Sequence, residues 1–126
     1  MSVIYSNEHI YIKVHSSEIP WLKIYSQQAC KEFSECDEMT RQQIWQLLGL
    51  VEREMLAYFK PEKINIASFG NYKPQVHWHV MARFAEDSYY PEPMWGTKQR
   101  EAVLAFPSMS GFLAELLPKI DDMLKA

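Results

Sequence analysis

The sequence predicts an α+β domain, in which an antiparallel β-sheet packs against a long central α-helix and a C-terminal helix. Three observations favour this class. The first third of the chain holds short segments rich in β-branched and aromatic residues, one long helical pattern follows, and two strand-like segments then flank a Gly/Pro turn. With 126 residues, 48% of them hydrophobic, the chain has enough apolar side chain for one core.

Five segments have the composition of β-strands. The expected strands are residues 3–5, 9–15, 21–25, 63–69 and 75–83. Between the last two, the run Gly-Asn-Tyr-Lys-Pro at 70–74 has strong turn chemistry. These two strands are therefore expected to form an antiparallel hairpin.

The long helix is expected to run from about Asp37 or Thr40 to Phe59. Its apolar residues follow the 3.6-residue period; they are Ile44, Leu47, Leu48, Val51, Met55 and Tyr58. Thr40 with Gln43 fits a capping box, and Asp37 is an equally good N-cap, so the sequence leaves both open. Pro61 ends the helix.

A second helix is expected over residues 108–125, and Pro118 must kink or split it. Residues 85–97 are irregular, with many Pro, Tyr and acidic residues. We expect residues 3–107 to form a single domain and residues 108–126 to form a C-terminal helix packed on the same domain.

Composition excludes several classes of function. Thirteen basic and sixteen acidic residues give a net charge of −3, and no Lys/Arg run is present, so long nucleic acid is not an expected partner. No apolar run approaches the ~20 residues of a membrane span, and the N-terminus resembles no secretory signal. We expect a cytoplasmic protein in which Cys30 and Cys36 are free thiols.

The segment Gln75-Val76-His77-Trp78-His79 alternates polar and apolar residues. Because side chains of a strand alternate between its two faces, Gln75, His77 and His79 share one face and the apolar residues share the other. A neutral imidazole whose second nitrogen is held by an acceptor can attack phosphorus, and water can then cleave the covalent intermediate.

Two simpler interpretations stay open at this point. The paired histidines can be surface residues without a function. A His-x-His pair can also bind zinc, but zinc sites need about three or four ligands. The other histidines are His9 and His15, and no Cys-x-x-Cys is present, so no metal and no cofactor are expected.

Residues 75–81 resemble the motif of the histidine-triad (HIT) family of nucleotide hydrolases and transferases. That motif is His-φ-His-φ-His-φ-φ, where φ is apolar, and this chain has glutamine in the first position. The flanking residues resemble a bacterial branch that often carries this glutamine; they are Asn65, Gly70, Asn71, Pro74, Arg83, Asp87, Pro91, Pro93, Trp95 and Gly96. The resemblance covers most of residues 3 to 100.

The resemblance implies catalytic roles for three residues. His77, the middle histidine, would be the nucleophile, and His79 would support the phosphoryl group and its leaving atom. Gln75 replaces the first histidine; its carboxamide can donate and accept hydrogen bonds but cannot become a cation.

The resemblance also implies substrate-binding roles for Asn65, Asn71 and Arg83. Asn65 would bond to the nucleotide or the nucleophile, or else it is a strand-edge residue that bonds to a loop. Arg83 would balance phosphate charge, or else it pairs with Glu86 or Asp87. His15 stands near the position where the family often has an acid for the ribose hydroxyls, and a solvated strand-end histidine is the simpler reading.

The implied activity is hydrolysis or transfer on nucleoside phosphoramidates or dinucleoside polyphosphates through a nucleotidyl-histidine. The alternative is a nucleotide-binding module with little or no turnover. The implied ligand is a purine mononucleotide or dinucleotide, and the implied assembly is a homodimer. Residues 89–95 either cover the nucleotide as a flap or form a rigid loop packed on the body, and we favour the rigid loop.

Overall fold

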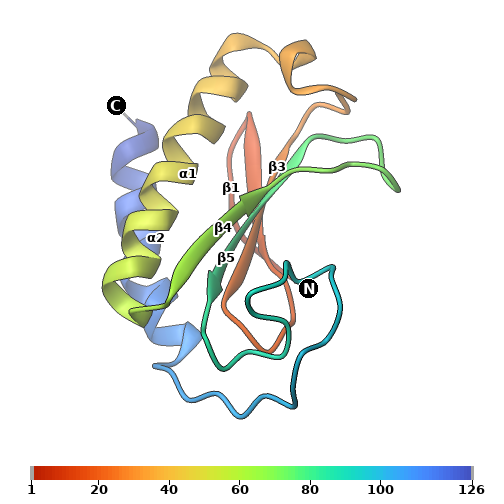
Figure 1. The fold of residues 1–126 in the computed structure, drawn as a ribbon. Coiled ribbons are helices and arrows are strands. Elements are labelled where there is room, and N and C mark those ends of the chain that lie inside the picture. Colours follow the sequence, from red (N-terminus) through yellow and green to blue (C-terminus); the bar gives the residue numbers. More distant parts are fainter. Residues whose placement is uncertain (1, 126) are drawn as a thin grey trace.

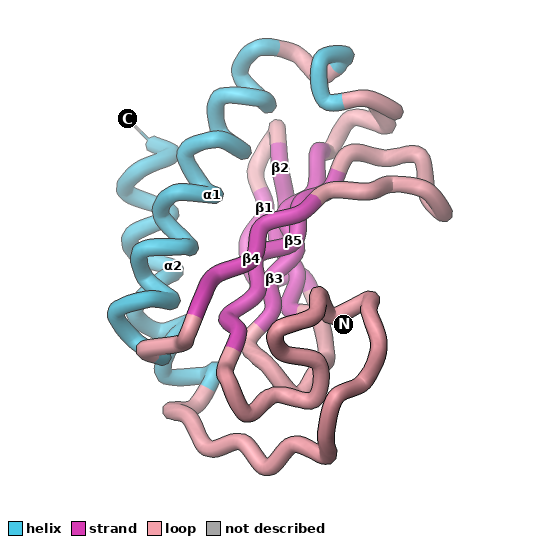
Figure 2. The backbone as a smooth tube through the Cα atoms, in the orientation of Figure 1, coloured by secondary structure: helices cyan, strands magenta, loops and turns pink. Residues whose placement is uncertain are grey.

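The computed structural model describes residues 2–125, and it has an α+β architecture, as predicted. One five-stranded sheet has the order β1-β2-β3-β5-β4, and every neighbouring pair is antiparallel. The elements are β1 (Val3–Ser6), β2 (Ile10–Val14), β3 (Trp21–Ser26), a 3-10 turn (Phe33–Glu35), α1 (Glu38–Phe59), β4 (Lys63–Ala67), β5 (His77–Arg83) and α2 (Met109–Lys125). Both helices lie on one side of the sheet, and the turn between β4 and β5 extends away from them (Figures 1 and 2).

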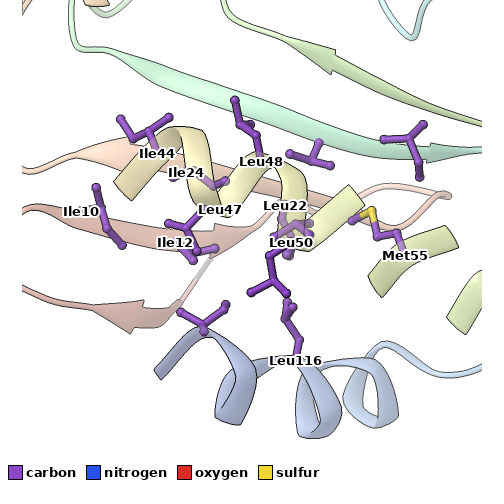
Figure 3. Close-up of a cluster of buried hydrophobic side chains, with 14 of the residues drawn as sticks. Ile10, Ile12, Leu22, Ile24, Ile44, Leu47, Leu48, Leu50, Met55 and Leu116 are labelled. Atoms are coloured by element: carbon purple, nitrogen blue, oxygen red, sulfur yellow. The ribbon is translucent and has the colours of Figure 1, made fainter. Parts of the chain in front are cut away.

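The core lies between the sheet and the helices. In β2, β3 and β5 every second side chain points to this side, and α1 contributes a stripe of Leu, Ile and Met (Figure 3). Fully buried members include Ile10, Ile12, Leu22, Ile24, Ile44, Leu47, Val51, Met55, Val80, Ala82, Leu116 and Ile120. Burial of this apolar surface fixes which face of each strand remains for other purposes.

The start of α1 is capped by Asp37, which decides between the two expected N-caps. Its carboxylate accepts a hydrogen bond of 2.8 Å from the backbone N–H of Thr40. At the other end, Lys60 adopts a left-handed conformation with φ 50°, and Pro61 follows it. Both ends therefore obey the expected rules of capping and termination.

Two elements differ from the expectation in detail. β5 begins at His77 rather than at Gln75. The carbonyl of Val76 accepts from Ser26 at the end of β3, but its N–H donates to the carbonyl of Cys30, in the segment after β3. α2 continues through Pro118 without a split. Phe112, two turns earlier, is buried in the core and helps to hold α2 against α1. No helix in the described part of the chain combines the length and apolarity needed to cross a bilayer.

The expectation of two free thiols is wrong, since Cys30 and Cys36 form a disulfide. Their Cα atoms are 5.7 Å apart, within the usual range for a bridge. The 3-10 turn at Phe33–Glu35 folds the intervening loop back on itself, and the sequence spacing alone does not reveal this approach.

Arg83, at the end of β5, organises the irregular segment that follows. Its guanidinium is almost completely buried and forms two hydrogen bonds with Asp87, of 2.9 and 3.0 Å. It also donates to the Asn65 side chain and to the carbonyl of Glu92. Burial raises the pKa of Asp87, but the hydrogen bonds from Arg83 and from three backbone N–H groups outweigh burial and lower that pKa.

We expect Asp87→Asn to lower the free energy of unfolding by about 3–5 kcal/mol, because it leaves the buried guanidinium without a counter-charge. Urea denaturation measures the change. The control is Asp121→Asn on α2, whose ion pair with Lys125 is exposed and should contribute less than about 1 kcal/mol. Equal effects of the two substitutions would contradict this role for Asp87.

Candidate active site

The sheet face opposite the helices carries the two motif histidines. Val80 and Ala82 of β5 enter the core, so His77 and His79 point to the other side, as the alternation predicts. On the neighbouring strand β3, Tyr25 is paired with His77, and Lys23 with His79. The antiparallel pairing of β5 with β3 therefore brings an aromatic ring and a cation beside the two imidazoles.

His77 is held in one tautomer by its own strand. Its Nδ1 lies 2.9 Å from the backbone carbonyl of Gln75. Because a carbonyl can only accept, Nδ1 carries a proton, so in the neutral form of the ring the lone pair lies on Nε2. The Tyr25 ring stacks on the imidazole, with 5.1 Å between centroids and 21° between planes. The orientation of the His77 ring is thus fixed on two sides.

His79 is buried and has the opposite tautomer. The indole N–H of Trp21 donates to its Nδ1 over 3.0 Å, and an indole nitrogen can only donate. A neutral His79 therefore carries its proton on Nε2. Burial, reinforced by His77, Lys23 and His15, lowers its pKa to about 4. At neutral pH it can donate a hydrogen bond without carrying a charge.

A cleft of about 490 Å³ opens over both histidines. Its lining combines aromatic rings with cationic and amide side chains. The lining residues are Lys23, Tyr25, Phe69, Gly70, Asn71, Tyr72, Lys73, His77, His79 and Trp95. Gly70 has φ 66°, a left-handed conformation that glycine adopts at little cost, and it turns the chain at the mouth of the cleft.

Trp95 closes one side of the cleft. Its ring lies 5.0 Å from His79 and 4.8 Å from Phe69, measured between centroids. Beyond the Phe69–Trp95 contact lies a second cleft of about 350 Å³, lined by β4 and Pro93. Trp95 thus borders the histidine cleft and also packs its ring against the body of the protein. The segment 89–95 therefore has features of both expected arrangements, the flap and the rigid loop.

Gln75 is buried and does not line the cleft. Its Nε2 donates to the carbonyl of Ser26 over 2.6 Å and approaches the Tyr11 hydroxyl at 3.3 Å. The side chain in the first motif position therefore fastens the start of β5 to the end of β3. This anchor also positions the backbone carbonyl of Gln75, which holds the Nδ1 of His77.

The three predicted substrate-binding residues lie in different places. Asn71 lines the histidine cleft. Asn65 lines the neighbouring cleft, and its Oδ1 accepts a hydrogen bond of 2.8 Å from Arg83. Arg83 is buried and paired with Asp87, which is one of its two expected arrangements. The fold therefore brings Asn71 to the histidines and keeps Asn65 and Arg83 apart from them.

His15 is not the solvated strand-end residue that we expected. Its ring lies over Trp21 at 4.2 Å between centroids, and its Nδ1 is buried without a hydrogen-bond partner within residues 2–125. Burial, and then the charge of Lys23, lowers the pKa of His15. Within the same described range, no group of three or more His, Cys, Asp or Glu side chains is arranged to hold a metal ion.

Several site residues were missed by the sequence analysis. Lys23 and Tyr25 alternate with the buried Leu22 and Ile24, so the period of β3 could have assigned them to the histidine face. The hydrogen bond from Trp21 to His79 spans 58 positions and depends on the strand register, which the sequence alone does not specify.

Fold and site together define the class of protein: a small α+β domain whose antiparallel sheet presents two oriented histidines in a cleft. The model of the HIT domain family matches residues 1–86. The chain therefore belongs to the HIT domain family, whose members are in general nucleotide-binding hydrolases or transferases. The expected family is thus confirmed.

Solved structures agree with this assignment. A histidine triad protein from Bradyrhizobium japonicum is 30% identical, with a TM-score of 0.77, over 94% of this chain and 90% of that one. A histidine triad protein from Sinorhizobium meliloti is 28% identical, with a TM-score of 0.72, over 92% and 87%. One from Marinobacter aquaeolei shares the fold at 21% identity and a TM-score of 0.70, over 98% and 88%. The comparison with curated protein sequences gave no significant match.

We expect NMR of the imidazole nitrogens to find His79 neutral down to a midpoint near pH 4, with its proton on Nε2. Trp21→Phe replaces the indole with a smaller aromatic ring that has no N–H, so the preference for this tautomer should fall by about tenfold, the value of one hydrogen bond. A wild-type His79 that carries its proton on Nδ1, or titrates near 6.5, would refute this account.

Proposed function

We propose that this chain is a nucleotide hydrolase or transferase that works through a covalent nucleotidyl intermediate on His77, in the family's bacterial branch with glutamine in the first motif position. The observation that carries the proposal is the 2.9 Å hydrogen bond from His77 Nδ1 to the Gln75 carbonyl, which in the neutral ring puts the lone pair on Nε2 beside an open cleft. An oriented neutral imidazole is a competent nucleophile toward phosphorus.

In the first step, the Nε2 lone pair of His77 forms a bond to phosphorus, and the bond from phosphorus to the leaving group breaks. The imidazole then carries the nucleotidyl group on Nε2 and a proton on Nδ1, so it bears a positive charge. The Gln75 carbonyl, already 2.9 Å from Nδ1, stabilises that charge. In the second step, water bonds to phosphorus, its proton passes to solvent, and the N–P bond breaks to restore His77.

The rest of the cleft suits a nucleotide. Tyr72 and Trp95 are exposed rings at its rim, where a purine base can stack on them. Asn71 offers an amide for hydrogen bonds to the sugar or the base. His79 Nε2–H donates to a phosphoryl oxygen or to the leaving atom. We propose a purine mononucleotide or dinucleotide as the ligand, with Asn65 and Arg83 shaping the neighbouring cleft.

The test is turnover of a phosphoramidate and a dinucleoside polyphosphate by wild type and His77→Ala. We expect the substitution to lower kcat by about 10³-fold or more, because it removes the atom that forms the covalent bond. His9→Ala is the matched control, since His9 does not line the cleft, and it should retain activity.

Mass spectrometry of enzyme denatured at alkaline pH should find a nucleotidyl group on His77 during turnover. Equal turnover by wild type and His77→Ala would refute the nucleophile. Tight binding of AMP without any turnover would favour the alternative, a nucleotide-binding module.

We also propose that two copies pair through β4 and the adjacent face of α1. β4 is an edge strand, with unpaired backbone groups along its outer side. Ile66 of β4 is 38% exposed, and Trp45 of α1 is 70% exposed. Both line an apolar hollow of about 320 Å³ together with Trp78. Large exposed apolar residues beside a free strand edge are typical of an interface.

Trp45→Glu should convert the dimer into a monomer, because it places a charge in the centre of this hollow. Light scattering coupled to gel filtration at micromolar concentration measures the mass. Val103→Glu is the control, because Val103 is even more exposed than Trp45 but lies outside the hollow. A wild-type monomer at these concentrations would overturn the proposed pairing.

A further inference from the structure

A single peptide group connects His77 to the loop that follows β3. The carbonyl of Gln75, which accepts the 2.9 Å hydrogen bond from His77 Nδ1, and the N–H of Val76 belong to the same planar unit. That N–H donates to the carbonyl of Cys30 over 3.0 Å. The His77 ring and the Cys30 carbonyl therefore hold this peptide group from its two ends. A movement of Cys30 would change the orientation of the acceptor on which the His77 ring depends.

The two hydrogen bonds also strengthen each other. When the N–H of Val76 donates to Cys30, the shared peptide group is polarised, and the Gln75 oxygen becomes a better acceptor. This is the oxygen that would stabilise the positive charge on the His77 imidazole during the proposed reaction. The Cys30 carbonyl thus acts on the His77 ring without contacting it.

The disulfide is the strong link between Cys30 and the core. Its other half, Cys36, is 1% exposed, belongs to the core, and directly precedes Asp37, the N-cap of α1. By contrast, the chain neighbours of Cys30, Ala29 and Lys31, are both exposed. A bridge between residues only six positions apart strongly limits the conformations that the loop can adopt. Without the bridge, the position of the Cys30 carbonyl would depend mainly on its weak hydrogen bond to the peptide group.

The disulfide also contacts the residue that anchors Gln75. The Sγ atom of Cys30 lies 3.6 Å from Ser26 Oγ. The carbonyl of Ser26 accepts from the Gln75 side chain over 2.6 Å, and its N–H donates to the Val76 carbonyl over 3.1 Å. Both residues that precede His77 are therefore fixed by groups in direct contact with the bridge or bonded to it.

We infer that the Cys30–Cys36 disulfide is a redox switch that positions His77. The closed bridge holds the Cys30 carbonyl against the peptide group that orients the His77 ring, and reduction of the bridge releases it. The effect on turnover rests on the proposed function, whereas the effect on the ring itself needs no substrate.

A dithiol reductant opens the bridge in two steps. Its thiolate forms a bond to the sulfur of Cys30, which is half-buried and hence more accessible than Cys36. The S–S bond breaks, and Cys36 leaves as a thiolate that takes up a proton. The second thiolate of the reductant then attacks the mixed disulfide, and Cys30 leaves and is protonated. The protein gains two electrons and two protons, and the dithiol becomes a disulfide; a disulfide of the same class reverses the reaction.

The experiment compares oxidised wild type with wild type reduced by dithiothreitol, using NMR of the imidazole nitrogens. In the neutral His77 ring, the preference for a proton on Nδ1 should fall by about three- to tenfold on reduction, up to the value of one hydrogen bond. Reoxidation should restore it. His79 is the internal control, because Trp21 of β3 determines its tautomer, and its proton should stay on Nε2 in both states.

Turnover gives a second measurement that a purely structural bridge would not change in this way. On reduction, kcat should fall by about the same factor as the tautomer preference, and KM should change by less than about twofold. The reason is that residues 27–36 do not line the cleft. The variant Cys30→Ser/Cys36→Ala should match reduced wild type and should not respond to dithiothreitol.

Three results would overturn the switch. They are two alkylatable thiols in wild type kept under air, the same His77 tautomer in both redox states, and loss of the His79 tautomer together with that of His77, which would indicate general loss of structure. If the His77 tautomer responds but no His77 adduct forms in either state, only the proposed function fails. If adducts form at equal rates in both states, only the switch fails.

Discussion

The two faces of strand β5 belong to different parts of the molecule, the hydrophobic core and the cleft. Its even-numbered residues enter the core beneath the helices, and its odd-numbered residues form the floor of the cleft and the buried ion pair beyond it. A shift of the register by one residue would exchange these sets and place both imidazoles in the core. The apolar contacts of Val80 and Ala82 with the helices therefore determine on which face the His77 and His79 rings lie.

The site also depends on how the two ends of β5 are anchored. At its beginning, the Gln75 side chain donates to the Ser26 carbonyl and the Gln75 carbonyl accepts from His77, so a side chain in the motif orients the His77 ring through the backbone. At its end, Arg83 donates hydrogen bonds to Asp87, Asn65 and the Glu92 carbonyl. These bonds determine the path of the loop that carries Trp95. The geometry of the site thus depends on residues that a ligand need not contact.

The sequence predicts the parts of this arrangement that follow from periodicity. The five strands come from their composition, α1 comes from the 3.6-residue period, and the shared face of His77 and His79 comes from the alternation of side chains along a strand. The resemblance of the residues that flank the motif implies substrate-binding roles for Asn65 and Arg83, but whether a buried guanidinium pairs with phosphate or with Asp87 depends on how the following loop folds. The disulfide and the contacts of Trp95 also depend on how loops fold, and the conformation of a loop does not follow from a periodic pattern in the sequence.

The ring contact between Phe69 and Trp95 has a consequence for ligands larger than one nucleotide. It joins two loops that are far apart in the sequence, the β4–β5 turn and the segment after β5, and both rings line both hollows on this side of the sheet. While the rings touch, they form a partition between two separate compartments. A molecule that pushed them apart would merge the compartments into one continuous trough, so movement of two side chains would change the length of ligand that the surface can accept.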